Sequence, residues 1–159
     1  MRELNKCIAQ FISEEVIRQG HKATDDHTLR CIWMGLAWQR ALDIDDRSGP
    51  CVKSFGITET VVMTLGHLVE RCNAGWRWGN VRVGNWRAPD AEQVPRLMKY
   101  WCRAVNEGNF TPDEAYKAFE EIHPFIDGNG RVGKIIHNWM NRTLLNPVLV
   151  QDFFGHGVP

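Results

Sequence analysis

The strongest constraint on the fold is a stretch near the C-terminus that carries helix-start, helix-stop and loop signals in order. Thr111-Pro112-Asp113-Glu114 supplies an N-cap threonine, a proline at the first helical position and a capping-box glutamate. Pro124 disfavours helical geometry in the residue before it, so this helix must end near His123. The next helix is expected to begin only after the glycines of residues 127–130. The stretch therefore predicts two helices joined by a glycine-containing loop.

Apolar residues elsewhere recur at three- and four-residue intervals, which is the spacing of amphipathic helices. Polar caps, glycines and prolines bound each run. The first three predicted helices run from Leu4 to Gly20, from the Thr24–Asp26 cap to the acidic stretch 43–50, and from Thr58 to Gly75. A fourth covers 94–105, with Pro95 in its first turn. The last runs from the glycine loop to Leu144 or Leu145, and Asn146-Pro147 ends it.

Residues 76–87 have a different pattern, because bulky and basic side chains alternate there around Gly-Asn pairs. Such alternation is typical of a β-hairpin, and Pro89 and Asp90 would close it. We therefore expect an all-α fold with one short hairpin. No linker or repeat divides the chain, so residues 1–159 are expected to form a single domain, with N-terminal helices in 1–73.

Composition narrows the possible partners. The chain has 19 Lys and Arg residues and 19 Asp and Glu residues. The protein therefore has no net positive charge whose electrostatic field would attract a nucleic-acid backbone or an anionic membrane. No stretch resembles a signal peptide or a membrane span, which favours a cytoplasmic protein and leaves delivery into another cell open. The five cysteines are scattered and never spaced as C-x-x-C, which argues against a disulfide framework or a zinc site and for a reducing compartment.

The predicted loop, residues 123–131, carries the chemistry. Its glycines can turn amide groups toward one point, and the helix that follows adds the positive end of its dipole, which together suit a phosphate. Arg131 can hold a phosphate through two parallel hydrogen bonds. Asp127 is a hard oxygen ligand of the kind that Mg²⁺ takes together with substrate phosphates. His123 titrates near neutral pH and can accept a proton from an attacking hydroxyl.

His123 to Arg131 resembles the signature of the Fic family, H-P-F-x-D/E-G-N-G-R-x-x-R. Every specified position matches except the last, where this chain has Lys134. The similarity extends over roughly Ala74 to Leu145. It implies a Fic fold, a helical bundle with a hairpin flap over the active-site loop.

The resemblance also implies an activity, protein adenylylation. The enzyme would transfer AMP from ATP to a Ser, Thr or Tyr hydroxyl of a target protein and release pyrophosphate. His123 would be the general base, and Asp127 would hold Mg²⁺ against the α- and β-phosphates. Phe125 would point into the core. The residues implied at the phosphates are Gly128, Asn129 and Gly130 around the anion hole, Arg131 at the outer phosphates, and Lys134.

By the same resemblance, the hairpin is a flap that pairs its edge with an extended stretch of the target and so holds the acceptor hydroxyl in line. The residues implied in target docking are Arg77, Trp78, Val81, Arg82 and Val83.

Lys134 stands where the family has a second arginine that contacts the γ-phosphate. A lysine is a point charge and not a planar fork, so the triphosphate tail is expected to be held differently. The family's inhibitory S/T-x-x-x-E-G/N motif is absent, because no glutamate has Ser or Thr four residues before it. We therefore expect Lys134 to have no internal acidic partner. The chain would then be an unrestrained enzyme, or a toxin silenced by a separate antitoxin protein.

Other interpretations stay open. One is a Fic-like transferase or kinase that uses another phosphate-containing donor, which Lys134 would permit. Another is a catalytically weak binding module that docks a partner through residues 77–87. The arginines and tryptophans of 71–89 could also stack on single-stranded nucleic acid, although the neutral net charge disfavours it. A P-loop at 128–134 is disfavoured, because Ile135 replaces the required Ser or Thr and no apolar strand precedes the loop.

Overall fold

A computed structural model describes residues 4–20, 25–48 and 55–154. Thr24 and Cys51, which the sequence analysis considered, lie outside these residues. The elements are the helices α1 (Lys6–Arg18), α2 (Asp25–Ser48), α3 (Glu59–Val69), α4 (Val94–Asn106), α5 (Pro112–Ile122) and α6 (Asn129–Met140), the 3-10 turn η1 (Ala91–Gln93), and the strands β1 (Arg82–Val83) and β2 (Trp86–Arg87).

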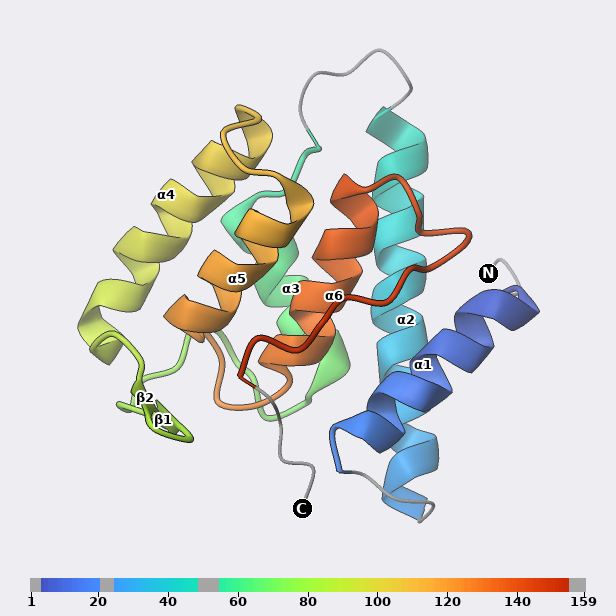
Figure 1. Ribbon diagram of the computed structural model, residues 1–159, viewed down its shortest axis with the longest axis horizontal. Coiled ribbons are helices and arrows are strands. Elements are labelled where there is room, and N and C mark those ends of the chain that lie inside the picture. The colour runs from blue at the N-terminus through green and yellow to red at the C-terminus, as the bar shows by residue number, and fades with distance from the viewer. Residues whose placement is uncertain (1–3, 21–24, 49–54, 155–159) are drawn as a thin grey trace.

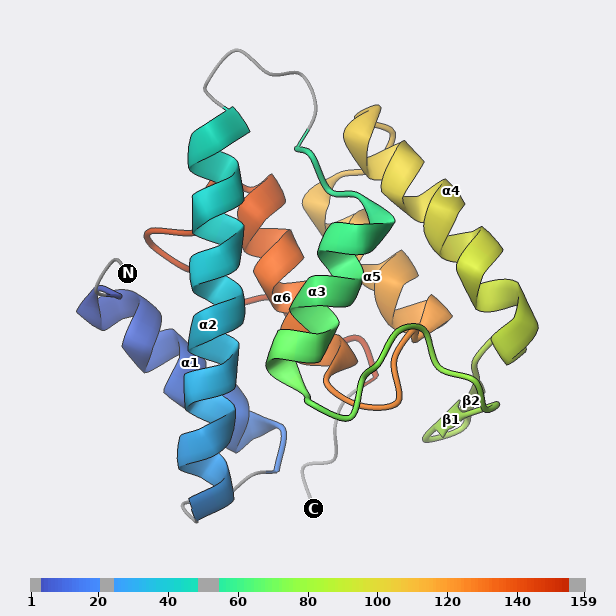
Figure 2. The same ribbon diagram turned by 180° about the vertical axis from the view of Figure 1, so that it is seen from behind.

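Helix α6 is the centre of the molecule. It contacts α2, α3 and α5, and every one of its residues is buried. Figure 1 shows α5 beside α6, with the C-terminal segment passing in front of α6, and Figure 2 shows α3 in front of α6 when the molecule is seen from behind. The predicted all-α fold with one hairpin is confirmed. Because the glycine loop leads directly into this enclosed helix, the loop is fixed from several sides.

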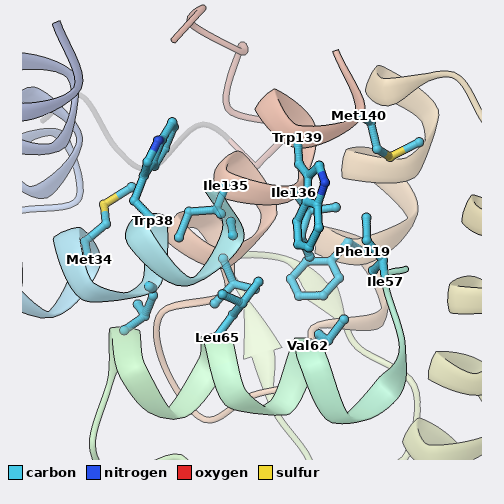
Figure 3. Packing of buried hydrophobic residues seen from close by; sticks show 14 of the residues in the cluster. Met34, Trp38, Ile57, Val62, Leu65, Phe119, Ile135, Ile136, Trp139 and Met140 are labelled. Atoms are coloured by element: carbon cyan, nitrogen blue, oxygen red, sulfur yellow. The ribbon is translucent and has the colours of Figure 1, made fainter. Parts of the chain in front are cut away.

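The hydrophobic core lies between α6 and its three neighbours. Figure 3 shows Ile135 of α6 facing Leu65 of α3, and Trp139 close to Phe119 of α5. All four of these side chains are fully buried. Burying a large apolar side chain stabilises a fold by roughly 1.5–3 kcal/mol, so these contacts hold α6 firmly against α3 and α5.

The predicted start signals of two helices are confirmed. Thr111 and Glu114 form the reciprocal capping box at the start of α5, and Pro95 lies in the first turn of α4. The predicted stop of α5 is also confirmed, because His123 is its C-cap residue.

Several predicted helix ends are wrong, each for a tertiary reason. Helix α2 continues through the acidic stretch to Ser48, because Asp45 accepts hydrogen bonds from Trp139 Nε1 (3.1 Å) and Arg142 Nη1 (2.7 Å). Helix α3 ends at Val69, before Gly75, since the next residue already has extended backbone.

The limits of α6 also differ from the prediction. The helix begins inside the glycine stretch, with Gly128 as its N-cap at φ 79°. It ends at Met140, before Leu144, because Arg142 adopts a left-handed backbone conformation with φ 61° that stops helical propagation.

The hairpin is shorter than the predicted 76–87. Its strands pair antiparallel, with Arg82 opposite Arg87 and Val83 opposite Trp86. Two of the preceding residues face the interior: the Trp76 ring lies 5.5 Å from the Phe125 ring, centroid to centroid, and Arg77 is buried. In the part of the chain that the structure describes, none of the helices has the length and apolarity that crossing a membrane would require.

Candidate active site

His123 stands at the junction of α5 with the loop. It caps the helix in the left-handed region, at φ 51° and ψ 62°, which a residue other than glycine seldom adopts. Its amide donates to Phe119 O (2.9 Å), and its carbonyl accepts from Arg77 Nε (2.7 Å). The unusual conformation turns the chain sharply away from α5, so the residues that follow can fold back toward α6.

Asn129 closes the loop. Its Oδ1 accepts from the amide of Phe125 (2.8 Å), and its Nδ2 donates to the carbonyl of the same residue (3.0 Å). Phe125 is completely buried, as the family resemblance implied, and it packs among the apolar core residues. The side-chain amide of Asn129 therefore shapes the loop from inside.

Two residues of the α3 region support the loop although the sequence analysis did not single them out. Gly66 has no side chain where the Phe125 ring lies, so the ring can enter the core. Asn73 Nδ2 donates to Gly66 O (3.1 Å) and to Asp127 O (2.8 Å), which ties the loop to α3. A glycine in the middle of an apolar helix is a weak signal of such a close contact; Asn73 has no comparable signal.

A cavity of about 110 Å³ lies at the start of α6. Its lining brings together the predicted base, the predicted metal ligand and the predicted anion hole, and it adds Gln19 from the end of α1. The lining residues are Gln19, His123, Ile126, Asp127, Gly128, Asn129 and Gly130. Amides in the first turn of a helix lack intrahelical acceptors, so this wall is suited to an anion. Ligand pockets usually measure about 300–1,000 Å³, so the cavity is small for a whole nucleotide.

Asp127 is the exposed carboxylate of the site, with about half of its side chain, 51%, accessible to solvent. Its Oδ1 accepts from the amide of Gly128 (2.6 Å), and its Oδ2 lies 3.6 Å from Arg30 Nη1. Within residues 4–20, 25–48 and 55–154, no three His, Cys, Asp or Glu side chains gather as a ready-made metal site. A magnesium ion at Asp127 would thus take its other ligands from phosphate and water, as this ion commonly does.

The guanidinium of Arg131 lies behind the cavity wall and is completely buried. Its Nη2 is 2.5 Å from Glu70 Oε1, and its Nε donates to Gln19 Oε1 (3.1 Å). Burial lowers the pKa of Arg131 to about 10 while nearby Asp127 acts in the opposite direction, so the group stays charged at neutral pH. Arg30 of α2, which the sequence analysis did not single out, also forms an ion pair with Glu70. A phosphate can reach Arg131 only by replacing one of these partners.

Lys134 points away from the cavity, toward α1 and the C-terminal segment. Its Nζ forms ion pairs with Glu15 and with Asp152 Oδ1 (2.5 Å for the latter), and the lysine and Glu15 are both fully buried. The prediction that Lys134 lacks an internal acidic partner is therefore wrong. Glu15 has no Ser or Thr four residues before it, so the motif search could not find it. The two charges meet because α1 and α6 both pack against α2, which is a tertiary arrangement.

The predicted docking flap lies beside the end of α5, where Trp86 Nε1 donates to Glu121 O (3.2 Å). Trp78 is 86% exposed and Arg82 is also exposed, whereas Val81 and Val83 are half-buried. Arg77 departs from the prediction: it is only 3% exposed, and its guanidinium turns inward to backbone carbonyls. Its side chain is thus not part of the outer face that a target would meet.

A comparison with solved structures agrees with the overall fold. The fold is similar to that of a Fic-domain-containing signalling protein from Bacteroides thetaiotaomicron, with a TM-score of 0.62 and 16% identity over 85% of this chain and 64% of that one. A Fic family protein from Desulfovibrio desulfuricans aligns with a TM-score of 0.47 and 19% identity over 89% of this chain and 59% of that one. The chain thus spans less than two thirds of either protein.

No curated protein matches the sequence. The sequence model of the Fic/DOC family does match it, over residues 57–140, which are more than half of the chain and include α3, the flap, the loop and α6. The chain therefore belongs to the Fic/DOC family.

Proposed function

We propose that this protein is a magnesium-dependent adenylyltransferase that moves AMP from ATP to a hydroxyl group of another protein. The observation that carries the proposal is the shared cavity, in which His123, the half-exposed Asp127 carboxylate and the amide-rich start of α6 face one space. Family membership supports a transferase of this kind.

In the proposed reaction, the acceptor oxygen attacks the α-phosphorus of ATP as His123 takes its proton. A new P–O bond forms to the acceptor, the bond to the β-phosphate oxygen breaks, and pyrophosphate leaves. The amides of Asn129 and Gly130 and the dipole of α6 stabilise the charge on the phosphates, whereas the amide of Gly128 donates to Asp127. Asp127 would hold a magnesium ion, which would neutralise phosphate charge.

The donor's outer phosphates need Arg131, whose guanidinium is held by Glu70 and Gln19. Gln19 is the partner that a phosphate replaces more readily, because it is neutral and lies on the cavity wall. Its displacement would also enlarge the cavity toward the size that a nucleotide requires.

A second candidate is a transferase whose donor has a shorter or different phosphate chain. It is favoured by Lys134, whose ammonium group is bound by two carboxylates away from the cavity. With Lys134 engaged in this way, a γ-phosphate would have fewer cations to bind than the family signature provides.

One experiment separates these candidates. The protein and its His123→Ala variant are incubated with Mg²⁺, a cell lysate and each donor in turn. The donors are the nucleoside triphosphates, the nucleoside diphosphates and nucleoside diphosphates that are linked to choline. Intact mass spectrometry then identifies the group added to proteins. Addition of AMP that depends on His123 supports adenylylation. Another added mass selects the second candidate, and the absence of any His123-dependent addition contradicts both.

A further inference from the structure

Arg77 is a buried cation at the point where the flap, α5 and the active-site loop meet. Its guanidinium donates to carbonyls at the end of α5, through Nε to His123 O (2.7 Å) and through Nη2 to Ile122 O (3.4 Å). It also donates to carbonyls at the two ends of the flap, Gly79 O (2.8 Å) and Pro89 O (2.5 Å). One side chain thus joins two structures that the proposed reaction must align.

The charge of Arg77 is balanced by backbone dipoles. Among the described residues, no carboxylate lies within ion-pair distance of its guanidinium, although Asp90 acts on it from farther away. Burial lowers the pKa of Arg77, yet the terminal carbonyls of α5 carry the negative end of the helix dipole and favour the cation. These carbonyls accept no hydrogen bond within the helix, so the Arg77 side chain satisfies them from outside and caps the C-terminal end of α5.

This cap acts on the proposed base. His123 occupies the left-handed region, which costs free energy and persists only where the surroundings hold it. Arg77 binds the carbonyl of His123 with its side chain, and its own amide donates to Pro124 O (2.8 Å). Arg77 therefore holds the two peptide groups that follow His123, and so the backbone from which the imidazole projects.

The same side chain determines where the flap lies. Gly79 and Pro89 are the points at which the chain enters and leaves the hairpin segment, and Arg77 bonds to both. Figure 1 shows β1 and β2 beside the ends of α4 and α5, and Figure 2 shows the same arrangement from behind. A flap held at both ends by the group that holds His123 cannot shift independently of it.

We propose that Arg77 is a positioning residue, which keeps the imidazole of His123 and the flap in one fixed geometry so that a protein acceptor bound to the flap presents its hydroxyl to the base. This inference rests on the proposed function for its kinetic consequence. Its structural consequence, the coupling of flap and loop, can be measured without any reaction.

The test compares the wild type with Arg77→Lys, which keeps the charge but loses the planar fork of donors. Arg103→Lys is the matched control, because Arg103 is 72% exposed on α4 and bonds only to a neighbouring glutamate in the described chain. Hydrogen exchange is followed at residues 79–89 and 122–125. We expect Arg77→Lys to exchange faster than the wild type at both segments, by about tenfold or more. The exchange rates of the remaining helices should not change. Unchanged exchange at either segment would overturn the proposal.

The kinetic arm uses ATP, Mg²⁺ and an acceptor protein found in the lysate experiment. Misplacement of reacting groups by about 1 Å can cost on the order of a hundredfold in rate. Arg77→Lys should therefore lower kcat by about tenfold to a hundredfold with KM for ATP nearly unchanged. A folded variant with wild-type kcat contradicts the inference, whereas an inactive wild type contradicts the proposed function and leaves the exchange result to decide the coupling.

If Arg77→Lys does not fold, an experiment on the wild type alone can test the coupling of flap and loop. Native-state hydrogen exchange in low denaturant should then find residues 79–89 and 122–125 opening as one unit with the same dependence on denaturant. Separate opening of the two segments would refute a common clamp.

Discussion

The ring of Phe125 occupies the space that a β-carbon on residue 66 would need, since such a carbon would lie 2.3 Å from Phe125 Cζ. The glycine belongs to α3 and the phenylalanine to the active-site loop, 59 positions later in the chain. This contact links the position of the loop to the core, because the ring can be buried only if the helix lacks a side chain at that point.

Gly66→Ala should therefore destabilise the protein. Overpacking typically costs about 1–3 kcal/mol, while replacing glycine in a helix regains up to about 1 kcal/mol. We expect a net loss of about 1–2 kcal/mol in the free energy of unfolding, measured by urea denaturation. Gly79→Ala is the control, since no atom lies within 4 Å of a β-carbon there. Adding Phe125→Leu to Gly66→Ala should recover part of the loss; strictly additive effects would show that the two residues do not compete for space.

Gln19→Ala should tighten nucleotide binding. The side chain bonds to Arg131 and lines the cavity, so ATP must displace it before the outer phosphates reach the guanidinium. Hydrogen bonds to charged groups are worth about 1.5–3 kcal/mol, so without this competitor ATP should bind about tenfold more tightly or better. Isothermal titration with ATP and Mg²⁺ measures the change. Gln10→Ala, on the exposed side of α1, should leave the affinity as in the wild type; weaker binding by Gln19→Ala would show that the glutamine helps to hold the nucleotide.

Glu15→Gln should destabilise the fold, because it removes one of the two carboxylates that balance the buried Lys134. Leaving a buried charge without any partner costs about 3–5 kcal/mol. Asp152 remains in this variant, so we expect a smaller loss of about 2 kcal/mol in chemical denaturation. Glu14→Gln changes the exposed neighbour on the same helix and should cost less than about 0.5 kcal/mol. Equal stability of the two variants would contradict a role of the Glu15–Lys134 pair in folding.

Glu120 should make stability depend on pH. Burial raises its pKa from 4.5 to about 7, with Lys134 opposing the shift and Asp152 adding to it. Between these values the folded state holds a proton that the unfolded chain has released. The free energy of unfolding therefore falls as pH rises from about 4.5 to about 7 and stays lower above that, by roughly 3 kcal/mol.

Glu120→Gln should remove this dependence and be more stable than the wild type at pH 8. Denaturation across pH 4.5–8 measures it as the difference between wild type and variant, which cancels the other titrating groups. Glu121→Gln, at the next and less buried position, should keep the wild-type profile. A Glu120→Gln difference that does not vary with pH would mean that Glu120 does not titrate in this range.

The local sequence was sufficient to predict where α5 starts, that it ends before Pro124, and the order in which the active-site residues follow one another. A capping box forms within one turn, and the restriction imposed by Pro124 acts on the adjacent residue, so neither depends on distant contacts. The clustering of His123, Asp127 and the glycines also follows from their closeness along the chain, since a short loop between two packed helices leaves them few arrangements.

Tertiary structure alone determined the partners of the charged groups and the role of Arg77. The Glu15–Lys134 pair joins residues 119 positions apart, and Arg77 reaches carbonyls more than 40 positions away, so no local spacing marks either contact. Local preferences are short-ranged, whereas a buried charge must find whichever acceptor the packed helices bring near it. The sequence thus specifies the chemistry available in the loop, and the packing of α2, α3 and α5 around α6 decides which of those groups face the cavity.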